Sequence, residues 1–180
     1  MILGNAASRS IVLLAAVLAG AVATASATGS PRASAAALSP LESGVLVDIN
    51  AFRAQHGLAR LRLNTRLTAA ARAHSSQMAE DGYFAHESAD GSPFWKRVQS
   101  FYRSSPWRFW SVGENLLWSS PSIDPNGALK LWLASPEHRK NLMNPRWREI
   151  GVSAVHVTAA PGTYGGIDVT IVTTDFGVRR

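Results

Sequence analysis

The chain has 180 residues, no cysteine and a formal net charge of +6, from 18 basic against 12 acidic residues. Its length fits one domain with a sizeable core behind an N-terminal leader. The absence of cysteine excludes disulfides, thiol catalysis and cysteine-bound metal, and the positive charge comes without any recognised motif for binding nucleic acid.

Residues 1–27 have the features of an export signal peptide. Arg9 precedes an apolar run from Ile11 to Ala23, and Ala25-Ser26-Ala27 offers the small residues that a signal peptidase recognises. The apolar run has 13 residues, whereas a membrane-spanning helix needs about 20. We therefore predict cleavage after Ala27 and a secreted, extracellular protein that keeps no transmembrane segment, with an uncleaved N-terminal anchor as the alternative.

A flexible leader and a helix follow the predicted cleavage point. Residues 28–38 are rich in Ser, Ala, Pro and Gly and lack periodicity. This composition is typical of a linker, so we place the domain at residues 39–180. Ser39-Pro40-Leu41-Glu42 is a capping box with proline in the first turn, and the helix that it opens ends at Gly57.

A second helix is predicted from Asn64-Thr65 to Gly82. His74 lies on its apolar side, where a histidine is more often a hydrogen-bonded core residue than a ligand. The chain then leaves the helix through Tyr83-Phe84-Ala85-His86, so that His86 lies on a loop beside aromatic neighbours. Loop residues held in this way are frequent site residues.

A third helix and an aromatic stretch come next. Ser92-Pro93 predicts the start of the helix, which carries Phe94 and Val98. From Tyr102 to Trp110 the chain concentrates arginine, proline and aromatic residues. The rings form a rim for apolar or sugar ligands if they are exposed, and part of the core if they are buried.

The rest of the chain contains strand and helix patterns in turn. A strand is predicted at Ser111–Trp118, a loop at Ser119–Gly127 and a helix at Ala128–Ala134. Two alternating, β-branched segments, Glu149–Thr158 and Ile167–Phe176, indicate strands joined by a turn. Helices early and strands late predict an α+β fold in which helices cover an antiparallel sheet.

The stretch from Trp132 to Met143 joins the end of one helix to the start of the next. Ser135 is a favoured N-cap residue, Pro136 suits the first helical position, and Glu137 brings negative charge to the first turn. His138 follows in that turn, where the positive end of the helix dipole disfavours protonation. A neutral imidazole of this kind can accept a proton or bind a metal.

Five blocks in order resemble the CAP superfamily, which includes cysteine-rich secretory proteins, insect antigen 5 and plant pathogenesis-related proteins. They are Asn50–Arg53 with His56–Leu58, Gly82–His86, Gly113–Leu116, Trp132–Asn144 and Glu149–Val152, with Asp175–Gly177 closing the chain. The match spans residues 41–177, and the absence of cysteine points to the bacterial branch of the family. The resemblance implies a three-layer α-β-α sandwich with a central antiparallel sheet.

In this family, two histidines and acidic residues converge in a solvent cleft, and the matching positions are His86, Glu114 and His138. The resemblance therefore implies a ligand-binding cleft that holds a divalent metal such as zinc on these three side chains. The family has a second acidic residue at the place of Ser135, which we include in the cleft. Because a hydroxyl is a weaker ligand than a carboxylate, we expect weak metal binding. We also expect Glu114 to be buried and oriented by hydrogen bonds.

Two protease-like arrangements have little support in the sequence. Ser135, His138 and Glu114 have the residue types of a nucleophile, a base and an orienting acid. No Gly-x-Ser-x-Gly elbow accompanies them, and helix capping already explains Ser135. A His-Glu-x-x-His motif is also missing, so a zincin-type protease is not indicated.

We therefore predict a secreted, monomeric CAP-domain protein that binds an extracellular ligand. Outside a cell its positive charge suits a lipid or an anionic polymer of the cell envelope, and an apolar groove beside the cleft would take the apolar part of the ligand. A metal-dependent hydrolase that uses the same His/Glu cleft is the alternative, and a structural cell-surface protein is a third. Nucleic acid is not an expected partner, because export removes it.

Overall fold

Five helices and four strands make up the part of the chain that the structure, a computed structural model, describes, residues 37–180. The helices are α1 (Pro40–Gln55), α2 (Thr65–Asp81), α3 (Phe94–Phe101), α4 (Pro125–Ala134) and α5 (Pro136–Leu142). The strands are β1 (Arg62–Leu63), β2 (Trp110–Ser119), β3 (Glu149–Val157) and β4 (Val169–Arg179). None of these helices has the length and apolar character needed to cross a membrane. The predicted signal peptide and most of the leader lie outside the described residues.

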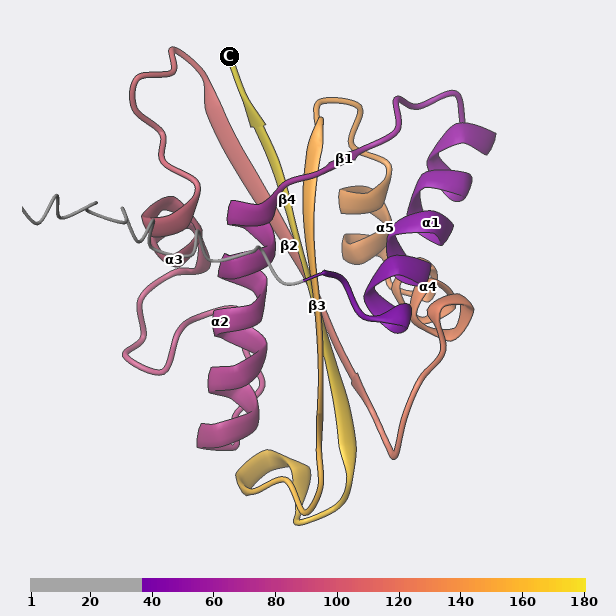
Figure 1. The fold of residues 1–180 in the computed structure, drawn as a ribbon, viewed down its shortest axis with the longest axis vertical. Helices are drawn as coiled ribbons and strands as arrows, with labels where there is room; N and C mark the ends of the chain where they lie inside the picture. The colour runs from indigo at the N-terminus through magenta and orange to yellow at the C-terminus, as the bar shows by residue number, and fades with distance from the viewer. Residues whose placement is uncertain (1–36) are drawn as a thin grey trace, which may run out of the picture. The chain divides into compact units, whose positions relative to one another are not determined.

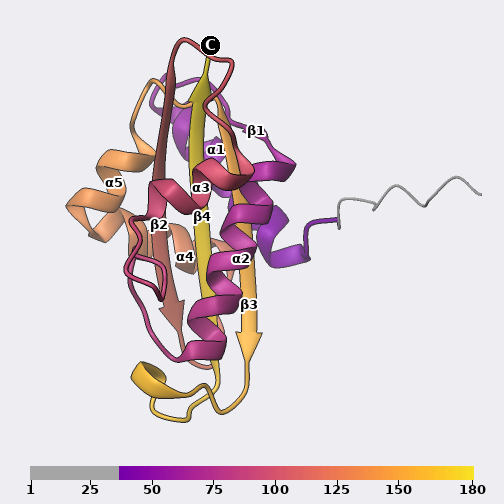
Figure 2. The ribbon, with the colours of Figure 1, turned by 90° about the vertical axis from the view of Figure 1, so that its left-hand side faces the viewer.

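The strands form one sheet in the order β1-β3-β4-β2. The central strand β4 pairs antiparallel with both β2 and β3, while β1 pairs parallel with β3. Figure 1 shows the sheet between two helical layers, α2 and α3 on one face and α1, α4 and α5 on the other, and Figure 2 shows the first face. The predicted α-β-α sandwich is confirmed; the two-residue β1, which was not predicted, adds a parallel pair at the edge.

Local capping explains where α1 and α2 begin. Ser39 Oγ accepts from the backbone N–H of Glu42 at 3.2 Å, and Glu42 Oε2 accepts from the N–H of Ser39 at 2.7 Å, which is the predicted capping box. Asn64 Oδ1 accepts from the first N–H groups of α2. Gly82 ends α2 in the left-handed conformation, φ 69°, that glycine adopts without strain.

One helix start and two side-chain caps differ from the prediction. Ser92 does not cap α3, because its hydroxyl donates to Asp90 Oδ2 at 3.1 Å. Helix α4 begins at Pro125, before the predicted Ala128, because Asp124 Oδ1 accepts from the N–H of Gly127 at 2.7 Å. Ser135 is the N-cap residue of α5, but its side chain accepts no capping hydrogen bond there. The backbone carbonyl of Ser135 accepts from the N–H of Arg139 at 2.9 Å, which is the first hydrogen bond of the helix itself.

The two faces of the sheet bury different side chains. Beneath α1, α4 and α5 lies a continuous apolar cluster that includes Trp132, Ile150 and Phe176. Beneath α2 and α3 lie two smaller apolar clusters. Between them are buried polar side chains, here called the polar band: His74, Ser75, Glu114, Thr173 and Asp175.

Helix α2 lies directly on β3 because β3 carries a glycine at the crossing. A Cβ atom at Gly151 would come within 2.1 Å of the Leu67 carbonyl carbon, so any larger residue would push the helix away from the sheet. This contact brings the polar side of α2 close enough to bond to the sheet: Ser75 Oγ donates to Thr173 Oγ1 at 2.8 Å.

The aromatic stretch before β2 divides between core and surface. Tyr102 is fully buried, Phe109 and Trp110 are half-buried, and Trp107 is 44% exposed. Both alternatives that the sequence left open are thus present, on different rings of the same stretch.

Candidate functional site

A cleft opens at the free edge of β2, where the two helical layers meet. Its volume is about 500 Å³. His86 reaches it from the loop after α2, and His138 reaches it from α5 on the opposite layer. The other lining residues are Phe94, Gly113, Glu114, Asn115, Glu137, Lys140, Asn141 and Asn144. The structure therefore brings together the three residues that were expected to converge.

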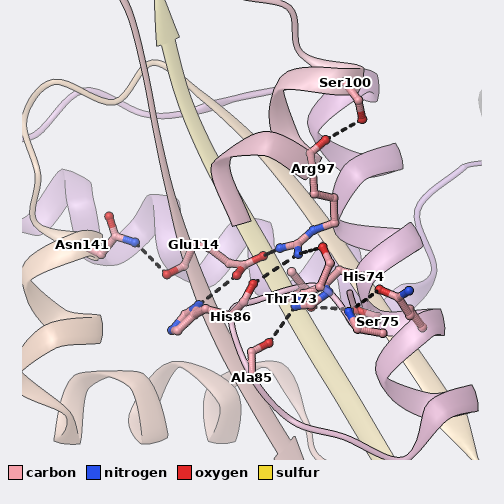
Figure 3. A network of polar contacts seen from close by, with 12 residues as sticks. His74, Ser75, Ala85, His86, Arg97, Ser100, Glu114, Asn141 and Thr173 are labelled. Atoms are coloured by element: carbon pink, nitrogen blue, oxygen red, sulfur yellow. Dashed lines mark hydrogen bonds and ion pairs between the residues drawn. The ribbon is translucent and has the colours of Figure 1, made fainter. Parts of the chain in front are cut away.

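Glu114 holds together the side of the cleft that carries His86, and Figure 3 shows it between His86 and Arg97. Its side chain is 0% exposed, and each carboxylate oxygen has a partner: Oε1 contacts His86 Nδ1 at 2.8 Å, and Oε2 pairs with Arg97 Nη2. The prediction that Glu114 is buried and oriented by hydrogen bonds is confirmed. Because an ionised carboxylate only accepts hydrogen bonds, His86 donates through Nδ1 and directs Nε2 away from Glu114.

Arg97 ties the His86 loop to helix α3. Besides its pair with Glu114, it donates from Nη1 to the carbonyl of His86 at 3.2 Å and to Ser88 Oγ at 3.0 Å. Its side chain is only 7% exposed. Arg97 thus compensates the buried charge of Glu114 and fixes the backbone that carries His86.

The opposite wall is held by two asparagines. Asn115 Nδ2 donates to the carbonyl of His138 at 3.1 Å, and Asn141 Nδ2 donates to the carbonyl of Glu114 at 3.1 Å. These bonds satisfy the edge of β2 and attach α5 to it. Gly113 permits the contact, since a Cβ atom there would lie 2.6 Å from Asn141 Oδ1.

Burial shifts several pKa values around the cleft. It lowers the pKa of His138, with a further contribution from nearby His86, so His138 favours the neutral form. The direction agrees with the sequence prediction, and burial is the leading cause. Burial also lowers the pKa of His74 to about 4 and, together with the charge of Glu114, raises the pKa of Asp175 well above its usual range.

Asp175 lies opposite Glu114 in the register of β2 and β4. It is 0% exposed, and no N–H or O–H group of residues 37–180 donates to its carboxyl oxygens, so a proton on Asp175 has the Glu114 carboxylate as its acceptor. His74 is equally buried; its Nε2 contacts the carbonyl of Ala85 at 2.9 Å, as expected for a core histidine, while its Nδ1 has no partner in the same region. A neutral carboxyl and a neutral imidazole therefore back the Glu114–Arg97 pair.

The metal site implied by the family resemblance is not assembled in this arrangement. Both oxygens of Glu114 are occupied by His86 and Arg97, and no three His, Asp or Glu side chains of the described region gather in a way that could hold a metal ion. Ser135 is not among the residues that line the cleft. The residues present do not fit a three-ligand metal site; of the three expected ligands, His86 and His138 still have a ring nitrogen without a hydrogen-bond partner in the described region.

The protease-like arrangement of Ser135, His138 and Glu114 is not formed either. Glu114 orients His86 rather than His138, and no hydrogen bond joins Ser135 to His138 within residues 37–180. The nucleophile, base and acid are therefore not connected in the way that a triad requires.

Sequence reasoning missed Arg97, Asn141 and Asp175. An arginine on an amphipathic helix is usually solvated, so nothing in the local pattern of α3 distinguishes Arg97. Asp175 carried a weak signal, since a lone carboxylate inside a β-branched, apolar strand has to be neutral or paired. Asn141 lay within the Trp132–Asn144 block, but only the tertiary contact with β2 explains it.

The family model described as the cysteine-rich secretory protein family, CAP, matches residues 46–174. Among curated proteins, the chain is 35% identical over 136 residues to the uncharacterised protein YkwD of Bacillus subtilis. It is 32% identical over 111 residues to the uncharacterised membrane protein YlbC of the same organism. These matches cover 75% and 62% of this chain, but only 50% and 30% of the relatives, so the chain spans half or less of their length.

Two solved structures share the fold. An outer surface protein of Borrelia burgdorferi superposes with a TM-score of 0.62 at 21% identity, covering 76% of this chain and 90% of that one. An extracellular protein of Bacillus anthracis that contains an SCP domain superposes with a TM-score of 0.57 at 27% identity, covering 81% of this chain and 45% of that one. Because its identity is only 21%, the Borrelia burgdorferi structure supports a shared fold and nothing more.

Proposed function

The chain belongs to the cysteine-rich secretory protein (CAP) family, and from this premise we propose that it is an exported binding domain whose cleft takes a component of the cell envelope. The ligand enters at the free edge of β2, between His86 and His138. Export is supported by the predicted signal peptide and by the likeness to the extracellular SCP-domain protein of Bacillus anthracis.

The chemistry of the cleft carries the proposal, because it favours binding over covalent catalysis. The lining supplies imidazoles, amides, an ammonium group and carboxylates, but no Ser, Thr, Cys or Tyr from the described part of the chain. The hydroxyl and thiol nucleophiles of most covalent mechanisms are therefore missing from this lining, and Glu114 is already paired on both oxygens. What remains is a set of fixed hydrogen-bonding groups around a cavity.

The size and lining of the cleft suit a ligand with a polar head. A volume of about 500 Å³ falls within the about 300–1,000 Å³ that is common for small-molecule sites. His86, His138 and Lys140 offer donors to hydroxyl or anionic oxygens, while the ring of Phe94 supplies an apolar wall. A lipid head group or a segment of an envelope polymer has this combination.

In this proposal the two imidazoles bind zinc only weakly. Without a third protein ligand, we expect a dissociation constant of about micromolar or above. Ligand binding does not depend on the metal, so a chelator should leave it unchanged.

Mass spectrometry of what the protein carries would test the proposal. The full chain is recovered from the culture medium or envelope fraction of an expressing bacterium, and its bound small molecules are extracted and identified. Wild type should retain an envelope component, and His138→Ala and His86→Ala should lose most of it while keeping their fold, because both imidazoles lie at the cleft and the side chain of His86 is half-exposed. His56→Ala is the matched control, because His56 is exposed at the end of α1 and does not line the cleft.

Two results would contradict the proposal. One is equal retention by wild type and by the two cleft variants, which would put the ligand elsewhere. The other is turnover of an ester or peptide that stops with chelator and with His86→Ala; this would establish the alternative, a metal-dependent hydrolase.

A further inference from the structure

Half of the basic residues in the described region gather at one end of the sheet, here called the arginine end. They come from four segments: the chain into β1, the stretch before β2, the turn before β3, and the C-terminus. They are Arg60, Arg62, Arg103, Arg108, Arg146, Arg148, Arg179 and Arg180. All are exposed except Arg179, which is half-buried.

Backbone pairing keeps these segments together. The N–H of Arg62 donates to the carbonyl of Arg148 at 2.9 Å, and the N–H of Arg148 donates to the carbonyl of Gly177 at 3.1 Å. Phe109 and Arg180 exchange two hydrogen bonds, of 2.9 and 3.0 Å. Figures 1 and 2 agree in showing the four segments at the end where the chain terminates.

Acidic residues do not neutralise this end. The segments 58–63, 102–110, 143–149 and 178–180 contain one acidic residue, Glu149. Its carboxylate is already engaged by Tyr102, Asn64 and Arg179. At the opposite end of the sheet lie Glu80 and Asp81, the last two residues of α2, and Asp168, which directly precedes β4. The domain is therefore electrically polarised along its strands.

Aromatic and aliphatic side chains stand among the arginines. The Arg179 guanidinium lies 4.1 Å from the Tyr102 ring centroid and 5.2 Å from that of Trp107, and Arg180 lies 4.9 Å from that of Phe109. Trp107 and Leu63 are each 44% exposed. Stacking of this kind holds an arginine side chain in place over a ring, while the N–H donors that the ring does not contact stay available to other groups.

We propose that the arginine end docks on a bilayer that contains anionic phospholipids. Guanidinium groups bind phosphate oxygens in bidentate fashion, and each basic residue near an anionic surface adds to the attraction. Exposed tryptophan and leucine favour a lipid surface over a free polyanion, because a tryptophan ring is stabilised at the boundary between head groups and acyl chains. The strands then stand end-on to the membrane, with the acidic end turned away.

Vesicle sedimentation tests this docking. The full chain is mixed with vesicles of phosphatidylcholine alone or with equal parts of phosphatidylglycerol, at about 0.15 M salt, where distant surface charges are screened. Binding should require phosphatidylglycerol. Arg103→Glu/Arg108→Glu/Arg146→Glu should weaken it by about 100-fold or more, since each cation near the surface contributes about fivefold. Residues 1–36 are the same in every variant and cannot account for the difference.

A matched control separates position from total charge. Lys96→Glu/Lys130→Glu/Arg139→Glu changes the net charge by the same amount at exposed sites away from the arginine end, and binding should fall by no more than about threefold at this salt concentration. Equal losses in the two triple variants would overturn the proposal. Arg103, Arg108 and Arg146 do not line the cleft, so their triple variant should still carry the envelope component that wild type retains, and failure here and failure of the proposed cleft function are distinguishable.

Trp107→Ala distinguishes a lipid surface from a free polyanion. The variant should bind phosphatidylglycerol vesicles several-fold more weakly than wild type, because it lacks the interfacial ring. Inorganic polyphosphate is the soluble comparison. Two results would assign the arginine end to a soluble polymer and overturn the membrane proposal. One is binding of polyphosphate without binding to vesicles; the other is vesicle binding that is equally strong in wild type and in Trp107→Ala.

Discussion

The two faces of the sheet are buried in opposite ways. Under α1, α4 and α5, apolar side chains such as Trp132 and Phe176 pack into one cluster. Under α2 and α3, the polar band interrupts the apolar packing with a paired carboxylate, a neutral carboxyl and a buried imidazole. The cleft opens at the edge of β2, where both faces end.

This difference means that one face mainly stabilises the fold, while the other mainly positions the side chains of the cleft. Apolar burial is non-directional and stabilises the fold whatever the exact rotamers of its neighbours. Buried charges stabilise only when every partner is present, because an unpaired one bears its full desolvation cost. In return, the polar band fixes His86 at one orientation, which apolar packing could not do for a half-exposed imidazole on a loop.

The largest effect is expected on the apolar face. Trp132→Ala should lower the free energy of unfolding by about 5 kcal/mol, since the ring is 0% exposed and its Nε1 donates to the carbonyl of Leu116 at 3.0 Å. Urea denaturation measures the loss. The adjacent Leu131→Ala, at a side chain 50% exposed, should change stability by less than about 1 kcal/mol. Similar losses of unfolding free energy in both variants would show that burial on the apolar face does not dominate the stability of the fold.

Next comes the charge pair of the polar band. Arg97→Met should lower the free energy of unfolding by about 3–4 kcal/mol, because Glu114 is left as an uncompensated buried charge. The double variant Arg97→Met/Glu114→Gln should recover part of that stability, since no charge is then left unpaired. Chemical denaturation of both variants checks this, and a double variant no more stable than the single one would show that pairing is not what the arginine supplies.

The buried imidazole should appear as a dependence of stability on pH. Burial lowers the pKa of His74 to about 4 in the folded state from a usual 6.5, so below about pH 6.5 the unfolded chain binds a proton that the folded chain does not. Stability should fall between these two values, by about 3 kcal/mol at most. Asp175, whose pKa is raised, acts in the opposite direction.

Comparison with His74→Gln cancels the contribution of Asp175. Denaturation curves at neutral pH and near pH 4 should show a steeper loss for wild type than for the variant. Parallel pH dependence in the two proteins would mean that His74 titrates in the folded state much as it does in the unfolded chain.

The smallest effect concerns the neutral hydrogen bond of the polar band. Ser75→Ala should cost about 1–2 kcal/mol, because Thr173 Oγ1 loses its partner at a fully buried position. Adding Thr173→Val should restore most of the stability, as both polar groups are then gone. The melting temperatures of the single and double variants show whether apolar residues can replace Ser75 and Thr173, the uncharged pair of the polar band, without loss of stability.

Much of the fold could be predicted because it depends on neighbours in the chain. The caps at Ser39 and Asn64 use hydrogen bonds that span two or three residues, so they are visible as short motifs. Strand and helix periodicity is likewise local. The start of α4 was missed although Asp124 is also a local cap, because the apolar pattern begins only later.

The convergence of three side chains in one cleft was predicted, but their contacts were not. The family resemblance placed His86, Glu114 and His138 in one cleft, and the structure brings them together. It also turns Glu114 from an expected ligand into a buried support for His86, and it leaves Ser135 outside the lining. Arg97, which makes that support possible, had no local signal.

The sequence by itself determined where α1, α2 and α5 begin, three of the four strands of the described region, and the absence of disulfide or thiol chemistry. Only the tertiary structure decided that Glu114 faces Asp175 across β2 and β4, and that Arg97 reaches Glu114 from α3. The physical reason is the distance along the chain between the residues that interact. Caps and periodicity involve a few adjacent residues, whereas the charge state and contacts of a buried carboxylate depend on strand register and on which helix packs above it.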